Sequence, residues 1–327
     1  MTTTIDTAAI DPHTHLDPTL AERLARRPWP ATPLRPLEVS FEYFPANTDA
    51  GTEQLIRTAG TLADVAPRFV SVTYGAGGTT QERTLRSIQA ISPVAGAPIA
   101  GHLTCVGASK SEIHEVVDAY AAAGVRHIVA LRGDAPADAT DGGVHPDGYT
   151  TAAELVAGIR SRDDGDSWRI SVAAYPEIHP KAASAAADLD NLAAKFDAGA
   201  DEALTQFFFD TDAFLRFHDA ARDHGIDSPI VPGIMPVTDF GKISNFAGRC
   251  GTRIPGWMSE LFDGLDDTPE IRAMVATTLA VEQCRRLAEH GITSLHLYTM
   301  NRADLSAAIC RSLGITGASA RVSARTA

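Results

Sequence analysis

The chain is poor in cysteine, and its cysteines lack the spacings that mark a disulfide framework or a metal site. It has four in 327 residues, far apart in the sequence, and no C-x-x-C pair occurs. Disulfide-rich domains and structural zinc sites both need several cysteines or histidines at short, regular spacings. We therefore expect reduced, buried thiols at Cys105, Cys250, Cys284 and Cys310.

Basic residues and long apolar runs are also scarce. The chain has 28 Lys and Arg against 41 Asp and Glu, a formal net charge of −13, which argues against nonspecific binding to nucleic acid. No run approaches the ~18 apolar residues of a membrane span. The N-terminus has no basic start followed by an apolar core, so we expect no secretory signal and predict a cytoplasmic location.

Three segments can be distinguished along the chain. Residues 1–37 are rich in Pro, Thr and Ala and predict a partly irregular N-terminal extension, because repeated prolines interrupt helices and sheets. One large catalytic domain is expected over residues 38–316, since this length suits a single α/β domain. A C-terminal tail is expected at residues 317–327.

Within the central segment, short runs rich in β-branched and aromatic residues alternate with Ala-, Leu- and Glu-rich stretches. Eight such strand-like runs occur, at 38–44, 68–74, 98–105, 127–134, 169–176, 202–209, 229–236 and 294–300. Eight strand-then-helix units predict a single (β/α)8 TIM barrel with a short N-terminal extension. An open, doubly wound sheet is the alternative, because alternation alone does not distinguish an open sheet from a closed one. Extra sequence after the seventh run predicts two helices in place of one.

The ends of two helices can be read from polar and glycine residues. The stretch "SEIHEVVDAYAAAG" predicts a helix with Ser111 as its N-cap and Gly124 as its stop. The stretch "DTDAFLRFHDAARDHG" predicts a helix that begins at Asp210 or Asp212 and ends at Gly225.

Glu42 is the most informative single residue. It lies among aromatic residues in the strand-like run "EVSFEYF", where a buried carboxylate is costly unless the site uses it. In a (β/α)8 barrel the chemistry takes place at the C-terminal ends of the strands. Polar groups occur at seven of these ends, in Glu42, "TYGAGG", "HLTC", "LRGD", "YPEIH", Gln206 and "YTMNR". Their convergence on one mouth favours a catalytic or cofactor site there.

Two kinds of site fit these strand ends. In a metal hydrolase, His13 and His15 would supply an H-x-H ligand pair, but they precede the first clear strand and lack supporting ligands on later strands. In a cofactor enzyme, the mouth would offer hydroxyl, imidazole and guanidinium groups to a dinucleotide. A Rossmann site is not expected, because no G-x-G-x-x-G follows a strand. Asp188, Asn191 and Lys195 share one face of a predicted helix and could line the same mouth.

Nine ordered blocks make the chain resemble the catalytic domain of bacterial-type methylenetetrahydrofolate reductases. The resemblance runs from about residue 38 to residue 315, through "SFEYFP", "FVSVTYGAGG", "HLTC", "HIVALRGD", "SVAAYPEIHP", "LTQFFFD", "PGIMPV", "RIPGWM" and "YTMNR". It implies a (β/α)8 oxidoreductase that carries FAD and uses NADH or NADPH. The implied reaction reduces 5,10-methylenetetrahydrofolate to 5-methyltetrahydrofolate, the methyl donor for methionine, by hydride transfer through FAD.

The resemblance also implies roles for individual residues. The implied FAD contacts are Thr73, His102, Arg132, Gly133, Asp134, Tyr175, His179, Asp188, Asn191 and Lys195. The implied folate contacts are Glu42, Gln206, Phe246, Tyr298 and Arg302. Glu42 and Asp134 are the implied catalytic residues, with Glu42 as the general acid, and no metal is implied.

A general acid must be protonated near neutral pH, so we expect a raised pKa at Glu42. Burial between Phe41, Tyr43 and Phe44 would disfavour the charged carboxylate. A flavin-independent reductase is the nearest alternative activity. The resemblance further implies a homo-oligomer that binds folate and a nicotinamide dinucleotide, with no nucleic-acid or membrane partner.

Overall fold

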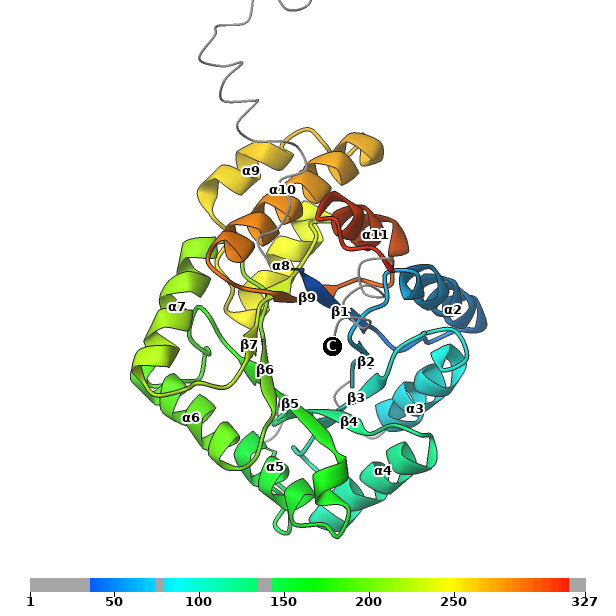
Figure 1. The fold of residues 1–327 in the computed structure, drawn as a ribbon, viewed down its shortest axis with the longest axis vertical. Helices are drawn as coiled ribbons and strands as arrows, with labels where there is room; N and C mark the ends of the chain where they lie inside the picture. The colour runs from blue at the N-terminus through cyan, green and yellow to red at the C-terminus, as the bar shows by residue number, and fades with distance from the viewer. Residues whose placement is uncertain (1–35, 75–78, 135–142, 318–327) are drawn as a thin grey trace, which may run out of the picture.

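The computed structural model describes residues 36–74, 79–134 and 143–317, and its strands form one parallel sheet that closes into a barrel (Figure 1). The strand order is β7-β6-β5-β4-β3-β2-β1-β9-β8. The strands are β1 (Glu38–Tyr43), β2 (Val70–Val72), β3 (Ile99–Thr104), β4 (His127–Leu131), β5 (Arg169–Ala174), β6 (Glu202–Thr205), β7 (Ile230–Val231), β8 (Gly233–Ile234) and β9 (Ser294–Tyr298). The predicted barrel is confirmed, and the open-sheet alternative is wrong.

The seventh strand-like run closes the barrel in two pieces. β7 pairs with β6, β8 pairs with β9, and Pro232 separates them. Proline has no N–H to give to a ladder, which interrupts the strand at this residue. Its carbonyl still accepts the backbone N–H of His296 at 2.9 Å, so the contact with β9 continues across the break.

Helices surround the ring of strands (Figure 1). They are α2 (Asp49–Ala63), α3 (Thr79–Ile91), α4 (Lys110–Ala122), α5 (Ala152–Arg160), α6 (Ala185–Asp197), α7 (Thr211–Asp223), α8 (Phe240–Cys250), α9 (Gly256–Phe262), α10 (Pro269–Glu289) and α11 (Ala303–Ser312). The two helices predicted in the extra sequence of the seventh unit are confirmed as α9 and α10. The predicted N-terminal extension and C-terminal tail lie almost wholly outside the described residues.

Of the two predicted N-caps, the one of α4 is wrong and the one of α7 is confirmed. The N-cap of α4 is Ser109, whereas Ser111 was predicted. The side chain of Ser109 accepts the backbone N–H of Glu112, and the side chain of Glu112 accepts the backbone N–H of Ser109, which completes a capping box. The N-cap of α7 is Asp210, as predicted. Gly124 and Gly225 follow the ends of these helices with φ of 79° and 84°, a conformation that glycine adopts without strain.

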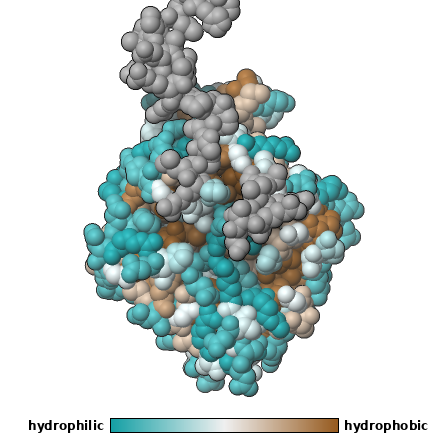
Figure 2. All heavy atoms as spheres, in the orientation of Figure 1, coloured by the Kyte–Doolittle hydropathy of each residue, from teal (hydrophilic) through white to brown (hydrophobic). Residues whose placement is uncertain are grey.

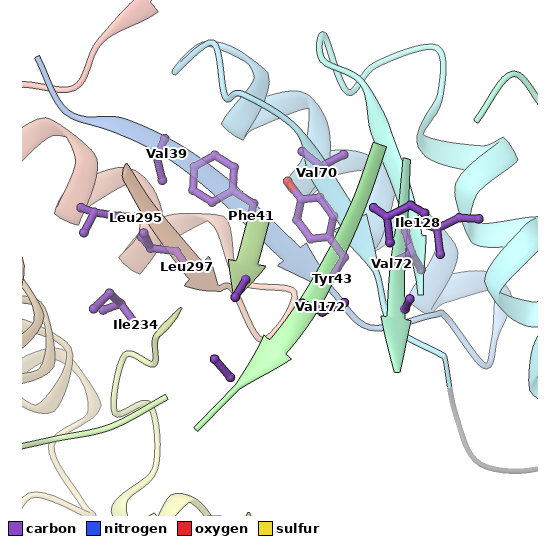
Figure 3. Packing of buried hydrophobic residues seen from close by; sticks show 14 of the residues in the cluster. Val39, Phe41, Tyr43, Val70, Val72, Ile128, Val172, Ile234, Leu295 and Leu297 are labelled. Carbon is purple, nitrogen blue, oxygen red and sulfur yellow. The ribbon is translucent and has the colours of Figure 1, made fainter. Parts of the chain in front are cut away.

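The alternation along β1 separates two environments. Phe41 and Tyr43 pack outward in the large core cluster between the strands and the helices, where Figure 3 shows them beside Val39, Val70 and other strand residues. The intervening Ser40 and Glu42 therefore face the barrel interior. Strand residues face outward and inward in turn all round the ring, so the interior forms its own cluster, of Phe69, Ala100, Val129, Leu204 and Val231.

The outer surface is mixed in character. In the orientation of Figure 1 it is largely hydrophilic, with hydrophobic areas between the hydrophilic ones (Figure 2). Within residues 36–74, 79–134 and 143–317, no helix has the length and the apolar character needed to cross a membrane.

Candidate active site

Glu42 is a buried carboxylate at the mouth end of the barrel interior. It is the fifth residue of β1, and its side chain is about 10% exposed. Phe41 and Tyr43 lie on the opposite face of the strand, so the expected burial between these rings is wrong. The interior of the barrel, with side chains from β3 and β9, buries Glu42 instead.

Two histidines face this carboxylate. The Nε2 atoms of His102 on β3 and His296 on β9 lie 3.3 and 3.6 Å from Oε2 of Glu42. Both nitrogens are buried, and neither completes a hydrogen bond of good geometry. Charge-assisted hydrogen bonds are usually ~2.7–2.9 Å long. The two contacts with Glu42 are longer than this.

The two histidines reverse the pKa shift that we expected at Glu42. Burial raises the pKa of its carboxyl group, but the nearby imidazoles of His102 and His296 outweigh burial. Together they lower the pKa from 4.5 to about 2. In this state Glu42 is a carboxylate, and the expectation of a raised pKa is wrong.

Both histidines are held by further contacts. Nδ1 of His296 lies 2.8 Å from the hydroxyl oxygen of Ser40. The hydroxyl of Tyr120 on α4 donates to the carbonyl of His102 at 2.7 Å. The sequence reasoning missed His296, although it lies two residues before Tyr298 in a strand and must share its face.

The end of β4 supplies the next group of residues. The Nε atom of Arg132 donates to the carbonyl of Thr150 at 3.2 Å, which fixes its direction. Gly133 has a φ of 85°, and a Cβ atom there would lie 2.8 Å from a methyl carbon of Val106. Only glycine lets the chain turn this closely over the end of β3. Asp134 follows and is exposed, and Thr73 lies at the end of β2.

The end of β5 and helix α6 face the same region. Burial, with the charges of Asp134 and Asp188, raises the pKa of Tyr175 to about 12. Both carboxylates therefore lie near the hydroxyl of Tyr175. The carboxylate of Asp188 accepts the backbone N–H of His179 at 2.8 Å. Lys195 is buried and donates to the carbonyl of Ala173 at 2.8 Å.

The implied folate residues are also at the strand ends. Phe246 on α8 stacks on Phe207, with ring centroids 5.5 Å apart, a partner that the sequence reasoning missed. The hydroxyl of Tyr298 donates to the carbonyl of Thr205 at 2.8 Å. Gln206 directly follows β6. Arg302 caps α11, pairs with Asp304 at 3.0 Å, and keeps 49% of its side chain exposed.

Two cavities border this mouth, beside Glu42 rather than over it. One of about 770 Å³ is lined by Asp134, Thr104 and residues of α3 and α4. The other, of about 470 Å³, is lined by Tyr175, Asp188 and residues of α7. Both are within the usual size range of small-molecule sites.

These residues fit an FAD molecule. Lys195 places a buried ammonium group beside the backbone of β5, below the mouth. Burial lowers the pKa of Lys195 to about 8, against the opposing charge of Asp188. An ammonium has three donors, so a phosphate oxygen could share it with the carbonyl of Ala173. A buried cation that lies near the ends of several strands suits a dinucleotide pyrophosphate.

The alternative metal site cannot be placed. His13 and His15 lie outside the described residues. In the part of the chain that the structure describes, no group of three or more His, Cys, Asp or Glu side chains could hold a metal ion.

Known proteins are similar to this chain over most of its length. A family model described as methylenetetrahydrofolate reductase matches residues 35–314. The chain is 47% identical to the 5,10-methylenetetrahydrofolate reductase of Pectobacterium carotovorum, over 85% of this chain and 91% of that protein. It is 45% identical to the Escherichia coli protein of the same name, with the same shares covered.

A solved structure shares the fold at low sequence identity. It is an uncharacterized protein from Clostridium thermocellum that binds two copies of 5-methyl-5,6,7,8-tetrahydrofolic acid. The TM-score is 0.60 at 13% identity, and the match covers 90% of this chain and 98% of that one.

Proposed function

Because this chain belongs to the methylenetetrahydrofolate reductase family, we propose that it reduces 5,10-methylenetetrahydrofolate to 5-methyltetrahydrofolate. The reductant is NADH or NADPH, and the hydride passes through FAD. The observation that carries this proposal is the buried carboxylate of Glu42 with two histidines, placed where a barrel does its chemistry.

We assign the cofactor to the mouth between β2, β5 and α6. The residues that would hold FAD are Thr73, His102, Arg132, Gly133, Asp134, Tyr175, His179, Asp188, Asn191 and Lys195. Bound FAD would supply the hydride carrier between the two substrates. Arg132 and Lys195 would neutralise the pyrophosphate, and Asp188 would keep the loop after β5 in place through His179.

The folate would lie over the ends of β6 and β9. Gln206 and Asp134 have hydrogen-bonding groups for the edge of the pterin ring. Phe246, backed by Phe207, offers an aromatic face for stacking. Arg302 would pair with the carboxylate of the glutamate tail.

Glu42 supports the step that activates the folate. The methylene group bridges N5 and N10 of the folate, and protonation at N10 opens this ring to an N5 iminium cation that accepts hydride. A carboxyl group with a pKa of about 2 does not hold that proton alone at neutral pH. We propose that one proton is shared among Glu42, His102 and His296, and that Glu42 delivers it to N10.

Two further properties stay predictions. The chain is expected to form a homo-oligomer and to work in the cytoplasm. A flavin-independent reductase is the alternative activity, and the visible spectrum distinguishes the two.

The test is the spectrum of the purified protein, after incubation with FAD and removal of the excess. We expect a yellow protein whose absorbance near 450 nm bleaches under anaerobic NADH or NADPH and returns when methylenetetrahydrofolate is added. Lys195→Met should weaken FAD binding, because it removes a buried cation, whereas exposed Lys181→Met is the matched control. A colourless protein that still reduces the folate would establish the flavin-independent alternative.

A further inference from the structure

The turn between β9 and α11 has an unusual backbone. Met300 and Asn301 are consecutive non-glycine residues with positive φ, of 51° and 55°. Asparagine tolerates this left-handed region better than most residues, whereas methionine has no such advantage. Strain of this kind costs about 1–3 kcal/mol per residue, and persists only where surrounding contacts hold it.

The side chain of Asn301 supplies such contacts, and they all go to the residue that follows β1. Its Oδ1 atom accepts the backbone N–H of Phe44 at 2.9 Å, and its Nδ2 atom donates to the carbonyl of Phe44 at 2.9 Å. The amide thus pairs with both backbone groups of one residue, as a neighbouring strand residue would. The regular β1–β9 ladder stops at the pair Glu42–Tyr298, so Asn301 extends it beyond its last pair.

Thr299 ties the same turn to Glu42 itself. Its hydroxyl donates to the carbonyl of Glu42 at 2.7 Å, and its backbone N–H donates to the same oxygen at 3.2 Å. The hydroxyl also accepts the backbone N–H of Asn301 at 3.1 Å. The backbone of the acid is therefore held at Glu42 by Thr299 and two residues later, at Phe44, by Asn301.

Arg302 lies at the other end of this turn, as the N-cap residue of α11. Its backbone N–H donates to the carbonyl of Thr299 at 2.9 Å, and its half-exposed side chain begins at the N-cap of α11. The turn thus links the strand that carries Glu42 to the arginine assigned to the folate tail. A change in the conformation of residues 300–301 would move Arg302 with respect to Glu42.

We propose that Asn301 is a positioning residue that sets the separation between Glu42 and Arg302, and so aligns the folate between the acid and the tail-binding arginine. This inference rests on the proposed function. It assigns Asn301 no contact with the reacting atoms. Misplacement of a reacting group by ~1 Å can slow a reaction by about 100-fold, so a clamp of two hydrogen bonds has a measurable effect.

The test variant is Asn301→Gly, because glycine keeps the positive φ and removes only the amide clamp. Thr58→Val is the matched control. The Thr58 hydroxyl, on α2, donates to the carbonyl of Asn301 at 3.1 Å, so its loss removes a partly buried hydrogen bond to the same residue and leaves the clamp intact. Both variants should lower the melting temperature by similar amounts.

Only Asn301→Gly should impair the folate half-reaction. We expect reoxidation of the reduced protein by methylenetetrahydrofolate to slow by about tenfold or more, with a higher KM for the folate. Reduction by NADH should stay within about twofold of the wild-type rate.

Equal losses in both half-reactions, or equal losses in both variants, would make Asn301 a purely structural residue and overturn the inference. Wild-type kinetics in Asn301→Gly would overturn it as well. A wild-type protein that carries out neither half-reaction would instead contradict the proposed function, so the two failures are distinguishable.

Discussion

At the scale of single residues, the environment of Glu42 explains why the barrel tolerates a buried carboxylate. Imidazoles from two other strands face the carboxylate and lower its pKa in spite of burial. A buried charge without such partners would cost several kcal/mol. The same partners can carry the proton that the folate requires.

The first residue-scale prediction concerns Glu42→Gln. Glutamine has nearly the same shape but cannot deliver a proton, and general acids typically contribute ~10²–10⁴ in rate. We expect reduction by NADH at close to the wild-type rate and reoxidation by methylenetetrahydrofolate slowed by about 100-fold or more. Stopped-flow absorbance near 450 nm follows both half-reactions separately.

Glu38→Gln is the matched control for this change. Glu38 begins the same strand, and its half-exposed carboxylate pairs with Arg68 at 3.2 Å, away from the mouth. This variant should keep both half-reactions. If Glu42→Gln turned over normally, the acid would have to be another group.

The sequence identified the position of Glu42 but not its electrostatics. Alternation along "EVSFEYF" places Glu42 on a strand, and a barrel places that strand end at the mouth. The direction of the pKa shift depends on His102 and His296, which come from β3 and β9 and meet Glu42 only in the folded ring. Local sequence predicts burial, but it does not predict which distant side chains will face the buried group.

At the scale of elements, the packing of β3 against α4 depends on one glycine. A Cβ atom at Gly101 would lie 2.4 Å from the ring of Tyr120, which is buried against the strand. The hydroxyl of the same tyrosine holds the carbonyl of His102 at 2.7 Å. This contact therefore couples the position of a helix to a histidine of the site.

The element-scale prediction is that Gly101→Ala destabilises the protein. Overpacking of this kind usually costs about 1–3 kcal/mol, because the ring and the strand must move apart. We expect a lower urea midpoint and, through the shifted His102, weaker binding of FAD. Circular dichroism and flavin fluorescence measure the two effects.

Gly60→Ala is the control. Gly60 is inside α2, and a Cβ atom there would lie 3.8 Å from Val94, an ordinary contact. Alanine is a better helix former than glycine, so this variant should be stabilised by about 0.5–1 kcal/mol. Equal stability of the two variants would show that the close approach at Gly101 is relaxed in solution.

Elements were predictable where their signals are local. Asp210 and the glycines after α4 and α7 mark real helix ends, because caps depend on residues within one turn. The N-cap of α4 was misplaced because Ser109 and Ser111 are both suitable, and only Glu112 completes a capping box with Ser109. The division of the seventh run at Pro232 could be inferred only with knowledge of both neighbouring strands.

At the scale of the whole molecule, the interior of the barrel carries charge at both ends. Toward the N-terminal ends of the strands, Nε2 of His127 lies 2.7 Å from the hydroxyl of Ser171, which donates to Glu202 at 3.0 Å. Arg68 and Arg169 pair with the same carboxylate at 3.1 and 2.8 Å. The count of eight strand-then-helix units predicted the closed ring. The contacts of His127, Ser171 and Glu202 depend also on the register in which β4, β5 and β6 pair, which the count does not give.

The last prediction follows from His127, whose pKa makes the stability of the barrel depend on pH. Burial, with the nearby charges of Arg169 and Arg68, lowers this pKa from 6.5 to about 3, against the opposing charge of Glu202. As the pH falls below 6.5, the unfolded chain takes up a proton at this residue and the folded barrel does not. Protons therefore favour unfolding over this whole range, and the loss should reach about 2 kcal/mol between pH 7 and pH 5.

Urea unfolding at several pH values between about 5 and 7 measures this effect. His127→Gln keeps a polar group near Ser171 but cannot titrate, so its stability should change less over this range by about the same 2 kcal/mol. His290→Gln, which removes a histidine from the exposed end of α10, is the control and should keep the wild-type pH dependence. The wild-type protein and His127→Gln could instead lose the same stability as the pH falls from 7 to 5. That result would mean that His127 binds its proton while the barrel is still folded. In that case Glu202 would hold an imidazolium within the barrel, and the interior would carry a second histidine–carboxylate pair like the one at the mouth.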